Sequence, residues 1–161
     1  MNFNWVLDSV AGQVPVPAQD RVAVSFGARD RLTYGELRDR TLRYARALRE
    51  LGLGRGDRLG LLLFNDPEYI PLYLAAARLG VITVRLNFRL APAELRFILA
   101  DSGCDVVIVH GSLAGKLGSV RDETGVRTCL VLPGSGGPGP GDAGPGDAVP
   151  SWAQPFTALQ G

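Results

Sequence analysis

The order of apolar and polar positions predicts a small hairpin followed by a strongly amphipathic helix. Residues 21–26 are rich in β-branched and apolar side chains and predict a strand, and residues 32–33 are placed to pair back against it. Residues 33–36 (Thr-Tyr-Gly-Glu) fit a capping box, which starts a helix. One side of that helix repeats at helical spacing and predicts a buried stripe: Leu37, Thr41, Tyr44, Ala45, Leu48 and Leu51. Gly52 supplies its left-handed end.

From residue 58 onward, apolar strand patterns alternate with helical patterns. Strands are expected at residues 58–64, 81–86, 105–109 and 127–132. The helices between them are expected to begin at residues 65–67, at Pro92 and at Ser112, the last running to about residue 120. This alternation predicts an α/β fold with a mostly parallel sheet and flanking helices.

The chain divides into three parts by composition. Residues 1–132 form the expected α/β subdomain, and residues 133–150 contain seven Gly and five Pro without hydrophobic periodicity, which predicts a loop. Residues 151–161 carry Trp152, Phe156 and Leu159 and are interpreted as the start of a truncated continuation.

Composition and charge exclude several classes of function. The 161 residues are 46% hydrophobic and 20% charged with a net charge of +1, so nothing indicates a nucleic-acid partner. No apolar stretch approaches the length of a transmembrane helix, and the first ten residues lack the basic start of a signal peptide. Two isolated cysteines and a single histidine predict reduced buried thiols, no zinc site and a cytoplasmic location.

Two glycine-rich runs have the look of phosphate-binding loops but the wrong context. Residues 52–56 follow a helix and precede a strand, so the helix N-terminus that holds a pyrophosphate is not there. Residues 111–116 end in Lys116 but have three residues between the glycines where the Walker spacing has four, and Leu117 replaces the hydroxyl residue. Both runs are interpreted as structural. No nucleophile elbow, catalytic triad or metal-ligand pair appears, so no catalytic or metal-binding residue is assigned.

Six phrases, in order, carry a resemblance to a known family. They are residues 32–37 (Leu-Thr-Tyr-Gly-Glu-Leu), 52–59 (Gly-Leu-Gly-Arg-Gly-Asp-Arg-Leu), 63–69 (Leu-Phe-Asn-Asp-Pro-Glu-Tyr), 77–81 (Ala-Arg-Leu-Gly-Val), 86–90 (Leu-Asn-Phe-Arg-Leu) and 94–102 (Glu-Leu, then Leu-Ala-Asp-Ser). Together they resemble the N-terminal region of the acyl-CoA synthetase superfamily of AMP-forming, adenylate-forming (AMP-binding) enzymes, over about residues 5 to 132.

The resemblance implies a full-length ligase that converts a carboxylic acid and ATP to an acyl-AMP and then to a CoA thioester. ATP, Mg²⁺ and CoA are the implied cofactors and co-substrates, and a fatty acid is the expected acid. The family's phosphate loop, adenosine-binding Asp and catalytic Lys follow later in its members, and Lys116 matches none of them. The chain is therefore expected to be truncated before the phosphate-binding loop, to be inactive alone and to bind none of these ligands tightly.

One binding residue is carried over from the resemblance. Arg89 falls where aryl-CoA ligases have Asn-Pro-Arg-Leu, and there the arginine can contact the nucleotide phosphates of CoA; a guanidinium fits such phosphates well. This chain departs from the family pattern with Phe88 in place of Pro or Thr and with Arg85 in place of Pro. A surface arginine with a local salt bridge is the alternative interpretation.

Two alternatives to a CoA ligase stay open. One is a fatty acyl-AMP ligase or adenylation domain that loads a carrier protein. The other is a stand-alone, non-catalytic α/β binding or scaffold module. A homodimer or other self-association through exposed apolar surface is also expected.

Overall fold

The fold is described from a computed structural model, which defines residues 19–26, 30–133 and 149–159. The predicted loop at residues 133–150 and the first 18 residues of the predicted subdomain lie largely outside these ranges. Two short strands, β1 (Val22–Phe26) and β2 (Asp30–Thr33), pair as an antiparallel hairpin, as the sequence predicts.

The hairpin leads directly into the long helix α2 (Tyr34–Glu50), which begins with the predicted capping box. The Thr33 hydroxyl accepts from the Glu36 amide at 3.2 Å, and a Glu36 carboxylate oxygen accepts from the Thr33 amide at 2.8 Å. Thr41, Tyr44, Ala45 and Leu48 of the predicted stripe are buried, while Leu37 and Leu51 at its ends are half-buried. The charged side chains occupy the remaining faces of the helix.

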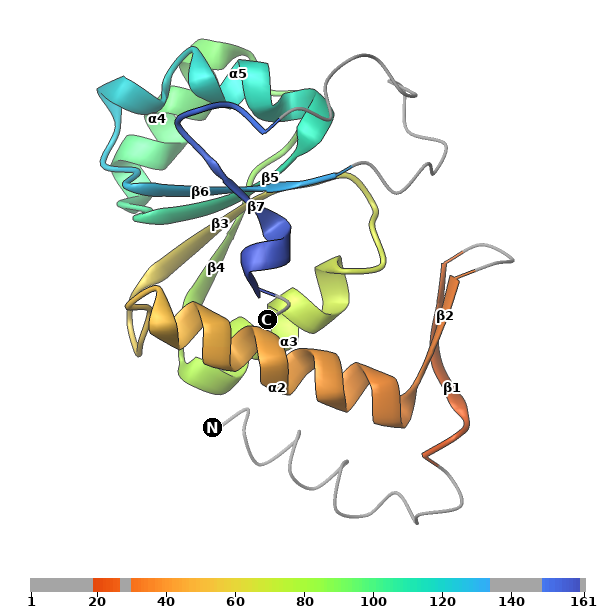
Figure 1. Ribbon diagram of the computed structural model, residues 1–161. Helices are drawn as coiled ribbons and strands as arrows, with labels where there is room; N and C mark the ends of the chain where they lie inside the picture. Colours follow the sequence, from red (N-terminus) through yellow and green to blue (C-terminus); the bar gives the residue numbers. More distant parts are fainter. Residues whose placement is uncertain (1–18, 27–29, 134–148, 160–161) are drawn as a thin grey trace.

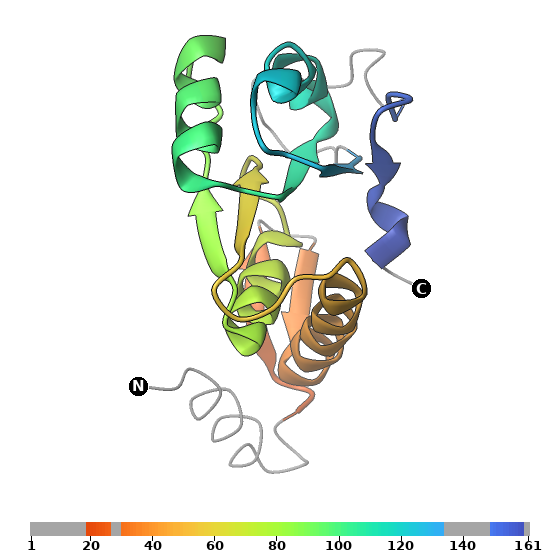
Figure 2. The ribbon, with the colours of Figure 1, turned by 90° about the vertical axis from the view of Figure 1, so that its left-hand side faces the viewer.

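Five parallel strands form the central sheet. They are β3 (Arg58–Leu62), β4 (Ile82–Arg85), β5 (Val106–His110), β6 (Thr128–Leu132) and β7 (Gln154–Pro155). Their order in the sheet is β4-β3-β5-β6-β7, and every neighbouring pair is parallel. Figure 2 shows β4 at one margin of the sheet and β7 at the other. The predicted α/β class with a mostly parallel sheet is confirmed.

Helices cover both faces of this sheet (Figure 1). On one face, α2, α3 (Tyr69–Leu79) and the 3₁₀ turn η4 (Phe156–Leu159) pack with one set of strand side chains. On the other face lie α4 (Pro92–Ser102) and the short α5 (Ala114–Gly118). Successive residues of β5 and β6 therefore enter opposite cores, which is why these strands are apolar throughout.

Two predicted helix starts are wrong by a turn or less. The helix expected from residues 65–67 begins at Tyr69, because Asp66 accepts the Glu68 amide at 2.8 Å and holds a turn ahead of it. The helix expected from Ser112 begins instead with the 3₁₀ turn η2 (Gly111–Leu113) and ends at Gly118. His110, and not Ser112, caps that turn by accepting the Ser112 amide on Nδ1.

Two further connections are defined by the structure. Another 3₁₀ turn, η3 (Arg121–Glu123), leads into β6. Residues 52–56 form the predicted helix-to-strand turn, with positive φ at Gly52 and Gly56. None of the helices within the described ranges has the length and apolar character that crossing a membrane requires.

Candidate functional site

The strand order creates a switch point at the carboxyl edge of the sheet. The chain passes from β3 through α3 to β4 on one side of β3, and β5 then lies on the other side of β3. In open α/β sheets, ligands bind in the crevice outside the carboxyl ends of the strands where the chain diverges in this way. The residues that directly follow β3, β4 and β5 are therefore the first candidates for contact with a ligand.

Three rings gather at this edge, one from the end of each of these strands. The Phe64 ring follows β3, and its centroid lies 4.8 Å from that of Phe88, which follows β4. The Phe64 ring also meets the ring of His110, at the end of β5, edge-on at 4.8 Å. His110 Nδ1 faces Ser112, whose Oγ lies 2.9 Å away and whose amide donates to it at 3.3 Å. The rings of Phe64, Phe88 and His110 thus form one aromatic surface at this edge, called the aromatic wall below. The bonds to Ser112 fix the orientation of the His110 ring within it.

The loop after β4 presents Arg89 beside this wall. The Arg89 amide donates to Asn87 Oδ1 at 2.9 Å, and the Leu90 amide donates to the Asn87 carbonyl at 3.1 Å, so residues 87–90 form a tight turn. The Arg89 side chain is exposed, with its guanidinium carbon 5.2 Å from the Phe88 ring centroid. Within the described ranges it forms no salt bridge, so the local ion pair of the alternative interpretation is not made there.

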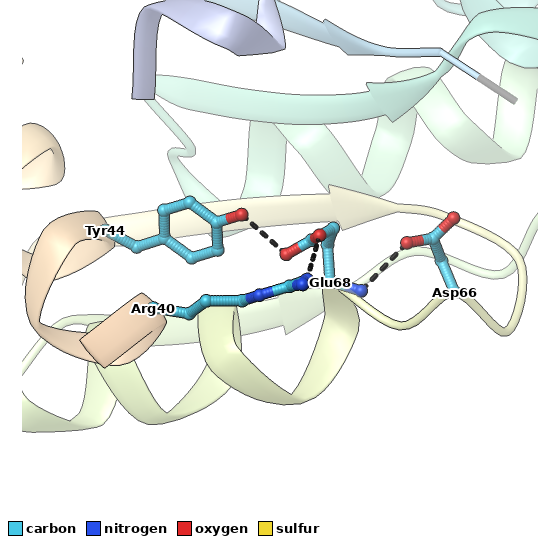
Figure 3. A network of polar contacts seen from close by, with 4 residues as sticks. All are labelled: Arg40, Tyr44, Asp66 and Glu68. Carbon is cyan, nitrogen blue, oxygen red and sulfur yellow. Dashed lines mark hydrogen bonds and ion pairs between the residues drawn. The ribbon is translucent and has the colours of Figure 1, made fainter. Parts of the chain in front are cut away.

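A polar network fixes the neighbouring loop between β3 and α3 (Figure 3). The Glu68 carboxylate accepts from Arg40 and from the Tyr44 hydroxyl, both on α2, at 2.5 Å each. Asp66 is 2% exposed and accepts the Glu68 amide. Because Glu68 is itself largely buried, these charge-assisted bonds hold the loop more firmly than a surface ion pair would. The network thus anchors the loop between β3 and α3, which also carries Phe64.

The remaining chemistry-bearing side chains have structural surroundings. Lys116 bonds to backbone carbonyls of the 87–90 turn and not to its own glycine run, which agrees with the structural interpretation of residues 111–116. Cys104 and Cys129 are buried free thiols, as predicted. Burial raises the pKa of the Cys104 thiol, and it raises the pKa of Cys129 to about 11, so neither is a ready nucleophile.

Within the described ranges, no three or more His, Cys, Asp or Glu side chains gather into a group that could hold a metal ion by themselves. Mg²⁺ is usually held by one or two carboxylates together with water and substrate phosphates, so no step through Mg²⁺ is assigned to these residues. What the edge does offer is an aromatic surface, an exposed guanidinium and two well-anchored loops.

The sequence indicated only part of this site. Arg89 came from the resemblance, whereas Phe64, His110 and the bond from Tyr44 to Glu68 were not singled out. A usable signal was present, because Phe64 and His110 stand at the carboxyl ends of two predicted parallel strands, where the rule for ligand crevices applies.

Comparison with known proteins places this fold in a family. The sequence model for the AMP-binding enzyme family matches residues 13–153. The chain therefore belongs to the AMP-binding enzyme family, whose enzymes generally use ATP, Mg²⁺ and CoA.

The relatives are acyl-CoA ligases. A 3-hydroxybenzoate–CoA ligase of Aromatoleum sp. (strain CIB) is 40% identical over 104 residues, covering 65% of this chain and 20% of the relative. A long-chain-fatty-acid–CoA ligase of Mycobacterium tuberculosis is 41% identical over 122 residues, covering 76% of this chain and 24% of the relative. The crystal structure of the N-terminal domain of FACL13 from Mycobacterium tuberculosis has a TM-score of 0.72 at 33% identity, over 82% of this chain and 34% of that one. The chain thus spans about a quarter or less of the length of these curated relatives and matches their N-terminal region.

Proposed function

We propose that the protein containing this chain is an AMP-forming acid–thiol ligase that makes an acyl-AMP from a carboxylic acid and ATP and transfers the acyl group to CoA. The observation that carries the proposal is the match of the AMP-binding family over residues 13–153. The parallel sheet, with an aromatic wall and an exposed Arg89 at its carboxyl edge, supports it because this edge is where such folds bind ligands.

The acid substrate belongs to the apolar carboxylic acids in this proposal. A fatty acid is the first choice, because one close relative is a long-chain-fatty-acid–CoA ligase. Aromatic acids are the second, because another relative is a 3-hydroxybenzoate–CoA ligase. Incubation of the protein with ATP, Mg²⁺, CoA and a panel of palmitate, octanoate, benzoate and 3-hydroxybenzoate should give one or more acyl-CoA thioesters by mass spectrometry. No thioester from any acid would contradict the CoA proposal.

In this proposal Arg89 contacts the nucleotide phosphates of CoA. Its guanidinium is exposed, lies beside the aromatic wall and has no carboxylate partner among the described residues. A charge-assisted bond to phosphate contributes about 1.5–3 kcal/mol, so Arg89→Ala should raise the KM for CoA about tenfold or more while acyl-AMP formation stays unchanged. An unchanged KM for CoA would remove this role.

The 161-residue chain alone is proposed to be inactive. Its sequence lacks the family's Ser/Thr/Gly-rich phosphate loop with Pro-Lys, so nothing in it is expected to hold the ATP phosphates. Purified chain should release no pyrophosphate from ATP with any acid of the panel. Release above the level of a heat-denatured control would contradict this.

Two other features belong to the proposal. The outer edge of β4 pairs with no strand of the described ranges and carries Ile82, 55% exposed, which supports self-association. Sedimentation velocity at two concentrations would reveal it, and a strictly monomeric chain would contradict it.

The two buried, unpaired thiols support a reducing, cytoplasmic location.

A further inference from the structure

Lys116, the only lysine of the chain, makes two bonds to a loop that lies far from it in sequence. It comes from α5, and its ammonium donates to the carbonyl of Phe88 at 2.7 Å and to the carbonyl of Leu90 at 3.0 Å. These two residues flank Arg89 on either side. A single cation therefore fixes the backbone both before and after the arginine.

The other bonds of the turn converge on the same residue. Asn87 holds the amide of Arg89 from one side, and the Phe88 ring packs on Phe64. With Lys116 added, the backbone around Arg89 is tied to β3 through Phe64 and to α5 through the ammonium. The Arg89 side chain is thus an exposed part of an otherwise anchored turn.

Charge at the turn also points to an anionic ligand. Neither Lys116 nor Arg89 forms a salt bridge with a carboxylate in the part of the chain that the structure describes. Lys116 bonds to the backbone of the turn that carries Arg89, so a phosphate bound at this turn would be attracted by both positive charges. Lys116, turned toward the carbonyls, contributes position and charge and leaves the exposed contact to Arg89.

We propose that Lys116 is a positioning residue for phosphate recognition: its bonds to the Phe88 and Leu90 carbonyls hold the 87–90 turn so that Arg89 meets the CoA phosphates without an ordering cost. This inference rests on the proposed CoA contact of Arg89. Preorganisation of this kind lowers the KM for the ligand without changing the chemical step.

The test uses the intact protein with Lys116→Met, which keeps the length of the stem and removes the donors. Hydrogen exchange of the peptide covering residues 86–92 should become about tenfold faster, because the turn loses two of its anchors. The KM for CoA should rise about five- to tenfold, with kcat and the KM values for ATP and acid unchanged. With pantetheine, which carries the thiol but no phosphate, Lys116→Met and wild type should behave alike. Lys116→Arg, which keeps a long stem with charged donors, should restore the KM for CoA to within about twofold.

A matched control removes a different cation. Arg96→Met breaks an exposed ion pair with Glu123 on the same face of the sheet and touches none of the turn, so it should change neither exchange nor KM. If Lys116→Met does not fold, Asn87→Ala, which loosens the same turn without touching Lys116, tests whether order in the turn sets the KM for CoA, and an unchanged KM despite faster exchange overturns the positioning role.

The possible outcomes test separately the anchoring by Lys116, its positioning role and the phosphate contact of Arg89. Unchanged exchange in residues 86–92 overturns the anchoring by Lys116. Faster exchange with an unchanged KM for CoA, while Arg89→Ala raises that KM, overturns the positioning role and leaves the contact of Arg89 standing. An unchanged KM in Arg89→Ala overturns the phosphate contact and the positioning role together, and thioester formation by the wild type then still supports the ligase proposal.

Discussion

The guanidinium of Arg58 closes the end of α4 and lies against Gly103. It donates to the carbonyl of Ser102 at 3.0 Å and to that of Gly103 at 2.8 Å, which are left without partners where the helix stops. Gly103 has φ +63°, and a Cβ there would lie 2.6 Å from Arg58 Nη2. A side chain at this position would therefore strain the backbone and displace the end of the flexible Arg58 side chain, which would weaken its two bonds.

Gly103→Ala should destabilise the fold by about 2 kcal/mol, of which the left-handed backbone accounts for about 1 kcal/mol. Gly52→Ala is the matched control, because Gly52 also has positive φ but has no atom within 4 Å of the added Cβ. Chemical unfolding of both variants measures the difference. Equal losses of stability would show that Arg58 does not pack against Gly103 as described.

The contacts of single residues were predicted least well from the sequence. Gly52 was recognised as a helix end because glycine accepts a left-handed backbone without strain, and it has positive φ. The bonds made by Arg58, Glu68 and Lys116 join residues 24 to 45 positions apart. Local patterns carry no information about such pairs, because their geometry exists only once the sheet has formed.

At the scale of the element, α2 shows how a local motif links stability to pH. The Thr33 backbone bond, followed by the Thr33 hydroxyl bond, lowers the pKa of Glu36 below its usual 4.5. A lowered pKa means that the folded state favours the carboxylate. The contribution of Glu36 is therefore complete above pH 4.5 and is lost as the pH falls through the lower, folded-state pKa.

In Glu36→Gln the free energy of unfolding should fall less steeply than in wild type as the pH drops below about 4.5, because the variant has no carboxylate to protonate at the cap. Thr33→Ala, which removes the hydroxyl acceptor, should cost about 1 kcal/mol at neutral pH. Urea unfolding across about pH 3 to 7 measures both effects. Glu50→Gln, at the far end of the same helix, serves as the control. If Glu36→Gln kept the wild-type pH profile, the capping box would not form in solution.

Elements with a complete local signal were predicted closely, and those without it were not. α2 has a cap, a stripe and a glycine end in its own sequence, and its bounds agree with the prediction. The start of α3 was misplaced because Asp66 and Pro67 resemble a cap but form a preceding turn. α5 is shorter than predicted because its expected first turn is the 3₁₀ turn η2, and it ends at Gly118, where the Ser119 amide bonds back to the Gly115 carbonyl.

At the scale of the whole molecule, the segment after the glycine-rich region returns to the sheet. β7 pairs with β6, and Phe156 is 1% exposed with its ring edge-on to Tyr44 at a centroid distance of 5.5 Å. Residues 154–159 therefore share a core with α2. The sequence was interpreted here as the start of a truncated continuation, and it could not predict a fifth strand of only two residues.

Phe156→Ala should cost about 3–5 kcal/mol, as expected when a fully buried ring is replaced by a methyl group. Phe97→Ala is the control, because Phe97 is 68% exposed, and it should cost less than about 0.5 kcal/mol. The free energy of unfolding separates them. A loss as small as that of Phe97→Ala would mean that the C-terminal segment is not part of the folded unit.

The central claim is that this parallel sheet serves an enzyme that activates carboxylic acids with ATP. Exchange of labelled pyrophosphate into ATP by the intact protein tests it most directly, because reversible acyl-AMP formation causes such exchange before any thiol takes part. With palmitate, octanoate, benzoate or 3-hydroxybenzoate present and CoA absent, we expect exchange that depends on the acid. Exchange that no acid of the panel stimulates would contradict the claim.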